Sequence, residues 1–423
     1  MLHSLPSSSA LDALFRDYDG PPFSIRLWDG WQWSSRPGKT PAFTISIATR
    51  EALASFISSP NEITLGEAFI HRALDIDGDL FEVFSVAEYL LERPRGLKQR
   101  LTESALRTVA GAGRWLRHGV RSSMRRDRSA IAYHYDQSVE FFRPWLGNSL
   151  VYSCAYFRST DDSLDQAQTQ KLETICRKLR LQPEERFLDI GCGWGSLVLH
   201  AASEHHAHAR GITLSKSQAG TAQRRIAEAR LDRNCSVELR DYRECADLYG
   251  TFDKIASVGM YEHVGLKNLR QYFKIAHQLL RPGGVFLNHG IARSSVSPVR
   301  KDSFIERYVF PDGRLVTLPQ ALQAAEAAGL EVRDVENLRE HYERTLRHWV
   351  EGLQENASVL LKHVPEMTYR IWLLYMAGSA AAFRRGDIAV YQVLLSRPDH
   401  GRSRLPLVRE DWYRESMQQI GSR

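Results

Sequence analysis

Three glycines at alternate positions, Gly191, Gly193 and Gly195, follow the apolar run at residues 187–190. The run has the pattern of a buried parallel strand, and the apolar spacing after the last glycine predicts a helix. Glycine accepts positive φ angles and lets a ligand lie against the main chain. The G-x-G-x-G spacing is neither the dinucleotide motif nor a phosphate-binding loop. It therefore favours the nucleoside of S-adenosylmethionine (SAM), with an ordinary tight turn as the alternative.

Polar side chains also follow the later strands of the predicted sheet. Asp241 and Tyr242 come after one strand, Glu262 after the next and His289 after the last. The strands are predicted at residues 187–190, 209–214, 237–239, 252–258 and 285–288, with helices at 164–179, 216–229 and 269–280. This alternation predicts a parallel α/β sheet, whose ligands sit outside the carboxyl ends of the strands. We therefore expect these side chains to converge on one crevice.

Two further regions could contribute to this crevice. Residues 134–157 are crowded with aromatic side chains and include Ser153 and Cys154. A core helix explains some of the aromatics, but buried hydroxyl and thiol groups need polar partners. Residues 345–361 and 371–383 are predicted to be helices, apolar on one face, that form a cap and an acyl channel. An ordinary closing helix is the alternative, and 13 apolar residues are too few to span a bilayer.

The N-terminal 90 residues show no catalytic constellation. They mix strand-like pieces at 43–48 and 62–65 with helix-like pieces at 50–58 and 80–91, separated by turn signals. A small α+β accessory domain is the prediction.

A basic segment follows at residues 91–128. It holds eleven Lys and Arg against three acidic residues, a local excess of +8, with apolar residues near helical spacing. This predicts an amphipathic helix on an anionic membrane surface, or else a solvated helix that packs on its own protein.

The composition indicates a soluble globular protein. The net charge of +6 and the pI near 9.0 are mild for a nucleic-acid binder, and the chain has no N/D-P-P-Y/W motif, so no nucleic-acid partner is expected. Five cysteines without a C-x-x-C pair indicate reduced thiols and no metal site. The first residues lack the pattern of a signal peptide. We expect a cytoplasmic protein that associates peripherally with the inner face of the membrane.

The motifs LDIGCGWG, GITLSKSQ, YSCAYF and YEHVG, in this chain's order with LLRPGG and AFRRGDI, resemble a known family. They are similar to the cyclopropane-fatty-acyl-phospholipid synthases and the mycolic acid cyclopropane synthases, over residues 131–397 and more weakly over 64–80. The resemblance implies a Rossmann-like class I SAM-dependent methyltransferase domain with a helical cap, plus the small N-terminal α+β domain. The expected domains are an accessory, lipid-binding domain at 1–95, a basic linker helix at 96–129 and a catalytic domain at 130–423.

The resemblance also implies the site residues. The predicted SAM-binding residues are Tyr152, Ser153, Asp189, Gly191, Gly193, Gly195, Thr213, Leu214, Gln218, Asp241 and Tyr242. A bicarbonate ion in the bacterial enzymes is held by a set that matches Cys154, Glu262, His289, Ile291 and Tyr342. No metal is expected. A glutamine takes the place of the acid that binds the ribose in many SAM enzymes, and its amide can bond a hydroxyl nearly as well.

The implied activity is the addition of a methylene across a cis double bond in a phospholipid acyl chain. Methyl transfer to the alkene leaves a carbocation that aromatic faces stabilise, and bicarbonate then removes a proton as the ring closes. Tyr261 and Asn288 differ from the residues common in the family, so a methyl-branched or exomethylene product stays open. A non-catalytic protein that binds lipid or SAM is a further alternative. The lipid headgroup and a homodimer are also left open.

Overall fold

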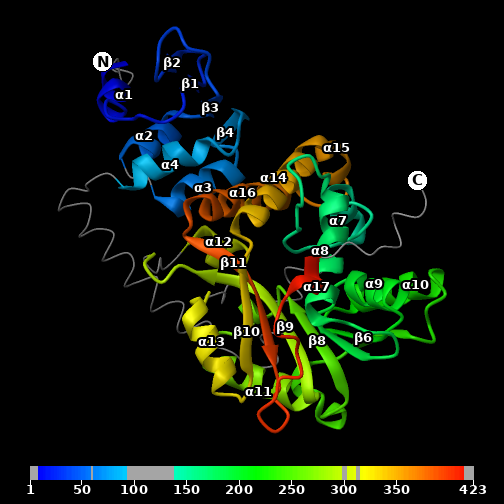
Figure 1. Cartoon of the computed structure of the whole chain (residues 1–423). Helices are drawn as coiled ribbons and strands as arrows, with labels where there is room; N and C mark the ends of the chain where they lie inside the picture. The colour runs from blue at the N-terminus through cyan, green and yellow to red at the C-terminus, as the bar shows by residue number, and fades with distance from the viewer. Residues whose placement is uncertain (1–7, 59–60, 93–137, 298–302, 311–314, 414–423) are drawn as a thin grey trace, which may run out of the picture. The chain divides into compact units, whose positions relative to one another are not determined.

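The computed structural model describes residues 8–58, 61–92, 138–297, 303–310 and 315–413 (Figure 1). Contacts group the chain into two units. The first holds the N-terminal residues together with segments 299–311 and 364–381, and the second holds the remainder from residue 124 onward. The predicted domain boundaries and the basic segment at 96–129 lie outside the described residues.

The second unit is built on a sheet of seven described strands in the order β10-β11-β9-β8-β5-β6-β7. The strands are β5 Arg186–Ile190, β6 His208–Thr213, β7 Cys235–Leu239, β8 Phe252–Val258, β9 Leu280–Arg293, β10 Glu331–Asn337 and β11 Ile388–Ser396. The five predicted strands pair in parallel, which confirms the α/β prediction. The sequence interpretation did not include β10 and β11, and β11 runs antiparallel to both of its neighbours.

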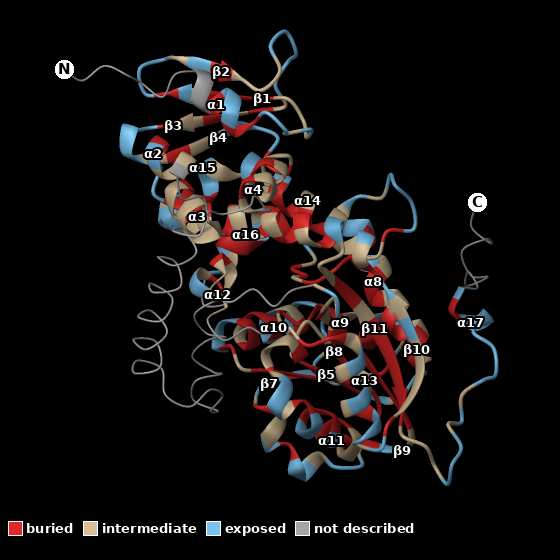
Figure 2. Cartoon of the chain, turned by 90° about the vertical axis from the view of Figure 1, so that its left-hand side faces the viewer, coloured by how far each residue is buried: buried red, intermediate tan, exposed pale blue. Residues whose placement is uncertain are grey.

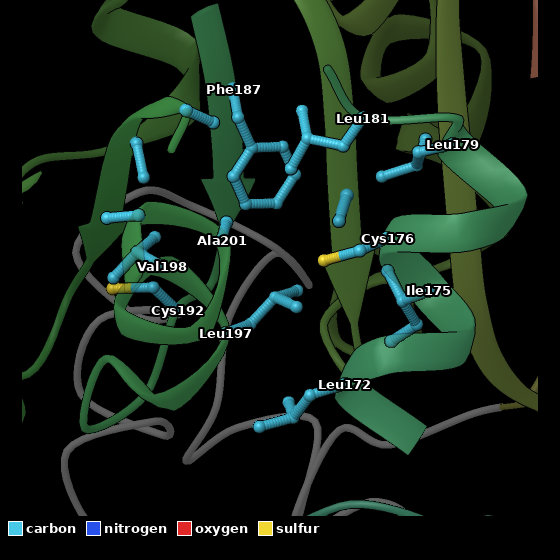
Figure 3. Close-up of a cluster of buried hydrophobic side chains, with 14 of the residues drawn as sticks. Leu172, Ile175, Cys176, Leu179, Leu181, Phe187, Cys192, Leu197, Val198 and Ala201 are labelled. Atoms are coloured by element: carbon cyan, nitrogen blue, oxygen red, sulfur yellow. The ribbon is translucent and has the colours of Figure 1, made fainter. Parts of the chain in front are cut away.

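Both faces of this sheet are covered, which explains the near-continuous apolar strands (Figure 2). The helices of the unit are α7 Val139–Leu146, α8 Leu164–Leu179, α9 Ser196–Glu204, α10 Lys216–Glu228, α11 Leu269–Leu279, α13 Leu318–Glu326, α14 Arg339–Glu355, α15 Ala357–Leu360 and α17 Glu410–Tyr413. Phe187 faces α8, α9 and α10, and its neighbour Leu188 faces α11 and α13. Figure 3 shows Cys176 of α8 and Val198 of α9 in the first of these clusters. The site residues therefore stand on a rigid support.

The strand predicted at residues 285–288 is longer than expected. β9 continues through His289 to Arg293, so the prediction that the strand ends at His289 is wrong. The cause is β11, which pairs with β9 as far as Arg293 and satisfies its main chain. His289 and Ile291 consequently lie two residues apart within one strand and share a face of the sheet.

The first unit contains a four-stranded sheet in the order β2-β1-β3-β4. Its elements are α1 Ser8–Leu14, β1 Phe23–Leu27, β2 Gln32–Ser34, β3 Phe43–Ile47, α2 Arg50–Ser58, α3 Glu62–Ile70, β4 Leu74–Gly78, α4 Val83–Glu92, α12 Phe304–Tyr308 and most of α16 Glu366–Arg385. The prediction of a strand at 62–65 is wrong, because Asn61 caps α3 by accepting from the Thr64 N–H. Among the described residues, no helix has the length and apolar character to cross a membrane.

Candidate active site

The glycine loop after β5 takes the backbone conformation expected of it. The φ angles of Gly191, Gly193 and Gly195 are 84°, 55° and 83°. A side chain at Gly195 would meet Ala222 of α10, so this glycine permits close packing of two helices. A Cβ at Gly193 would meet nothing within 4 Å. Gly193 is therefore the position where the main chain faces open space.

A pocket opens at this loop. It is lined by all of the predicted SAM-binding residues except Gly195 and Asp241, namely Tyr152, Ser153, Asp189, Gly191, Gly193, Thr213, Leu214, Gln218 and Tyr242. Asp241 is instead buried behind the lining, where its carboxylate pairs with Arg243 and caps the turn that carries Tyr242. Asp241 and Gly195 thus shape the pocket from behind.

The floor of the pocket carries a buried charged pair. Asp189 has one carboxylate oxygen, Oδ1, without a hydrogen-bond partner in the described part of the chain. Burial raises the pKa of Asp189 to about 7, and the nearby Lys171 opposes that shift. Burial lowers the pKa of Lys171 to about 8, and its Nζ donates to the Ser153 hydroxyl at 3.0 Å. Sequence reasoning missed Lys171, although a lysine on the apolar face of a predicted helix was a signal.

Gln218 is held at the far side of the pocket by its neighbours. The Ser215 hydroxyl caps α10 by accepting from the Gln218 N–H. The Thr213 hydroxyl donates to the side-chain amide oxygen of Gln218 at 2.7 Å. This bond orients the amide so that its nitrogen is the group that can donate to a ligand.

Glu262 belongs to a second group of predicted residues, which lies outside the lining of this pocket. It sits in the turn after β8, where its Oε1 accepts from the Ile291 N–H at 2.7 Å. Gly290 makes this approach possible, because any side chain there would collide with Tyr261. Burial raises the pKa of Glu262 to about 7. Its Oε2 is buried and has no hydrogen-bond partner among the described residues.

His289 is the second member of this group with an unsatisfied atom. Its Nδ1 lies 3.2 Å from the side-chain nitrogen of Gln392. Its Nε2 is buried and lacks a partner in the described chain. Burial holds the pKa of His289 well below its ordinary value, so the ring is neutral. Two buried polar atoms, one on Glu262 and one on His289, thus flank the same stretch of β9.

The main chain joins Cys154 and Tyr342 to this end of the sheet. The Cys154 thiol and the Tyr342 N–H both donate to the Leu338 carbonyl, at 3.8 and 3.0 Å. The Leu338 N–H donates to the Val390 carbonyl, and Val390 is the register partner of Ile291. Burial raises the pKa of Cys154, which keeps it a neutral thiol. The structure therefore brings the five predicted residues to one end of the sheet.

Aromatic rings connect the pocket with this second group. The Tyr152 ring lies 5.1 Å from that of Trp349, which lies 5.9 Å from the ring of Tyr342. The Tyr342 ring also contacts Phe383 at 4.7 Å. Sequence reasoning missed Trp349, although it stands seven residues after Tyr342 and so falls on the same face of α14.

One cluster in the described residues has the donor atoms of a metal site. The ligand atoms of Cys176, His200 and His205 all lie within 4.8 Å of one another. Both imidazoles, however, already face the same oxygen of Glu173, at 3.2 and 3.0 Å, and Arg177 pairs with its other oxygen. Burial raises the pKa of Cys176, whose side chain belongs to an apolar cluster. Glu173 therefore accounts for the histidines without a metal ion.

Comparisons with known proteins agree with this arrangement. The family model described as mycolic acid cyclopropane synthetase matches residues 122–393, and a domain of unknown function matches residues 10–90. A probable fatty acid methyltransferase of Pseudomonas putida is 41% identical over 93% of this chain and 96% of its own length. The cyclopropane-fatty-acyl-phospholipid synthase of Escherichia coli is 38% identical over 62% of this chain and 66% of its own length.

Solved structures show the same likeness. The cyclopropane synthase MmaA2 from Mycobacterium tuberculosis is 33% identical with a TM-score of 0.60, and covers 63% of this chain and 97% of its own. The mycolic acid cyclopropane synthase CmaA1, complexed with SAH and CTAB, is also 33% identical, with a TM-score of 0.59 over the same shares. The second unit accordingly has the class I methyltransferase fold, and the chain belongs to the mycolic acid cyclopropane synthetase family.

Proposed function

We propose that this chain is a SAM-dependent enzyme that adds a methylene across a cis double bond in a phospholipid acyl chain. The observation that carries this proposal is the pair of buried, unsatisfied atoms, Glu262 Oε2 and His289 Nε2, at the strand end next to the glycine-loop pocket. Buried polar atoms without partners are costly, so such a pair marks a place prepared for a polar ligand.

The pocket fits SAM by three features. The open space at Gly193 leaves room for a ligand against the main chain. The unsatisfied Oδ1 of Asp189 suits a ligand that carries an amino group, and the oriented amide of Gln218 suits a hydroxyl. SAM, when bound, supplies an electrophilic methyl group, and these residues would hold and orient it.

The second group fits bicarbonate. Glu262 offers an acceptor oxygen, His289 is neutral and can donate, and Cys154, Tyr342 and Ile291 lie at the same end of the sheet. An ion with both a hydroxyl and a charged oxygen matches such an acceptor and donor pair. Bicarbonate, when bound, supplies a proton acceptor that is not tethered to the protein.

The aromatic rings suit the reaction of an isolated alkene. Methylation of an alkene produces a carbocation, and aromatic faces attract a cation without bonding to it. The series Tyr152, Trp349 and Tyr342 runs from the pocket to the second group, along the route that such a cation would occupy. Thiol and carboxylate nucleophiles would trap the cation, and the raised pKa values of Cys154 and Glu262 limit that side reaction.

A second candidate is a fatty-acyl methyltransferase that leaves a methyl branch or an exomethylene group. The relative of Pseudomonas putida, named a probable fatty acid methyltransferase, favours it. The two candidates share SAM, the alkene and the cation. They differ in where the last proton is lost.

The test is the lipid profile of a host that expresses this chain, compared with a host that expresses its Glu262→Gln variant. A ring or an exomethylene group adds one carbon without saturating the chain, whereas a methyl branch adds two more hydrogens. Mass spectrometry separates the branch, and NMR separates ring from exomethylene. Cyclopropane signals that need intact Glu262 would support the proposal, and a branched product would favour the second candidate. An unchanged lipid profile would contradict both. We further propose that the protein meets its lipid at the inner face of the membrane, where binding to anionic vesicles that weakens at high salt would support it.

A further inference from the structure

We propose that Lys178 and Gln392 are positioning residues that hold His289 as the tautomer with its proton on Nε2. The value of that proton rests on the proposed function, since bicarbonate is the group that would accept it. The placement of the proton follows from the protein's own hydrogen bonds.

The three residues form a row at one level of the sheet. His289 on β9 is the register partner of Gln392 on β11, which is the register partner of Glu336 on β10. Lys178 reaches this row from α8, with a side chain that is only 2% exposed. Its Nζ donates to the Gln392 amide oxygen at 2.7 Å and pairs with the Glu336 carboxylate. The Tyr156 hydroxyl donates to the other Glu336 oxygen at 3.2 Å.

The donor and acceptor roles along this row are forced. An ammonium group only donates, so the group of Gln392 that faces Lys178 must be its oxygen. The amide nitrogen then faces Nδ1 of His289 at 3.2 Å, and it too can only donate. Nδ1 must therefore accept. In a neutral imidazole the single proton consequently lies on Nε2, the buried atom without a partner in the described chain.

The charged groups around the ring keep it neutral. Burial lowers the pKa of His289, and the positive charges of Lys171 and Lys178 lower it further. The Glu336 carboxylate balances the charge of Lys178 on the side of the row away from His289. The ring is thus a fixed neutral donor. The opposite tautomer would present a bare nitrogen lone pair, which repels an anion.

The direct test reads the tautomer without any reaction. The protein is labelled with ¹⁵N-histidine, and long-range ¹H–¹⁵N correlation spectra are recorded without SAM, lipid or bicarbonate. The His289 signal, among fifteen histidines, is assigned from its loss in His289→Gln. We expect a protonated Nε2 and a bare Nδ1. A protonated Nδ1 in the unaltered protein would overturn the proposal.

Gln392→Glu tests the cause. A carboxylate at this position can only accept, so Nδ1 must take a proton and Nε2 no longer carries the only one. We expect that shift in the spectrum and an about 10- to 150-fold higher bicarbonate concentration at half-maximal turnover, with SAM affinity unchanged. Gln392→Met, which removes both polar groups, should give a mixture of tautomers if Gln392→Glu does not fold. An unchanged His289 signal in both variants would contradict the proposal.

Lys178 and a remote glutamine complete the design. Lys178→Met leaves the amide undirected and should loosen the tautomer, whereas Lys178→Arg keeps a donor and should retain it. Gln223→Glu is the matched control, because Gln223 bonds the Val237 carbonyl on β7, at the opposite edge of the sheet from β10 and β11. It should leave the His289 signal unchanged. If the tautomer follows Gln392 but turnover ignores bicarbonate, the positioning pair stands and the proposed anion falls.

Discussion

The glycine-loop pocket and the group around Glu262 are built in different ways. The pocket is shaped largely by one strand, one loop and one helix that follow each other in the sequence, with Gly193 at its centre. The second group draws Cys154, Glu262, His289, Ile291 and Tyr342 from separate segments that meet only through pairing of β9, β11 and the end of β10. The first region depends on local backbone shape, and the second depends on register between strands.

Gly193→Val should break the first region alone, with the largest effect. A β-branched residue at a φ of 55° is strained by about 1–3 kcal/mol, and its side chain fills the space at the loop. We expect loss of measurable SAM binding by calorimetry while the fold is kept. Gly220→Ala on α10, where a Cβ has room, is the control. Unchanged SAM affinity in Gly193→Val would remove this site assignment.

Glu262→Gln should break the second region and spare the first. The amide can still accept from the Ile291 N–H, but it places a donor or a weak acceptor where Oε2 now lies. Loss of one charged hydrogen bond predicts an about 10- to 150-fold slower turnover. SAM affinity should not change. The exposed Glu184→Gln provides a control, and full activity of Glu262→Gln, or indifference of turnover to bicarbonate, would contradict the proposed base.

The raised pKa of Glu262 predicts how stability depends on pH. Between its unfolded value near 4.5 and its folded value of about 7, the folded state binds the extra proton, so stability falls as pH rises through this window. The loss is at most about 1.4 kcal/mol per pH unit. Unfolding free energies at pH 5 and pH 7 should therefore differ less in Glu262→Gln than in the unaltered protein. Equal differences in the two proteins would argue against a buried, protonated Glu262.

Tyr261→Phe should have the smallest effect. It removes the hydroxyl that donates to the Ile291 carbonyl at 2.9 Å and keeps the ring that packs on Gly290. The loss of one neutral hydrogen bond, about 0.5–1.5 kcal/mol, predicts a change of up to about tenfold in turnover. The ratio of ring to branched product is the sharper measurement. A large loss of SAM affinity would mean that the two regions are coupled.

The same contrast explains how far the sequence could be interpreted. The loop, its strand and its helix were predictable because three glycines and alternating apolar runs are local signals. The full length of β9 was not, since it depends on pairing with β11, which is nearly a hundred residues away in the sequence. Gln392 and Lys178 were equally hidden, because their meaning arises only from strand register. Likewise, α3 was mistaken for a strand because Ile63 and Thr64 favour strands, whereas the cap at Asn61 decides the outcome.

The chain passes repeatedly between the two units, and this limits how modular the protein can be. Arg370 of α16 is buried in the first unit, where it bonds the Phe69 and Leu74 carbonyls and pairs with Asp75. A fragment that began after the basic segment would still carry α16, but without these partners. It would leave a buried guanidinium unpaired and the side chains of Trp372 and Met376 without part of their cover. The N-terminal unit is thus an obligatory folding partner of a helix encoded far downstream, and the two units should be expressed, stored and inherited as one piece.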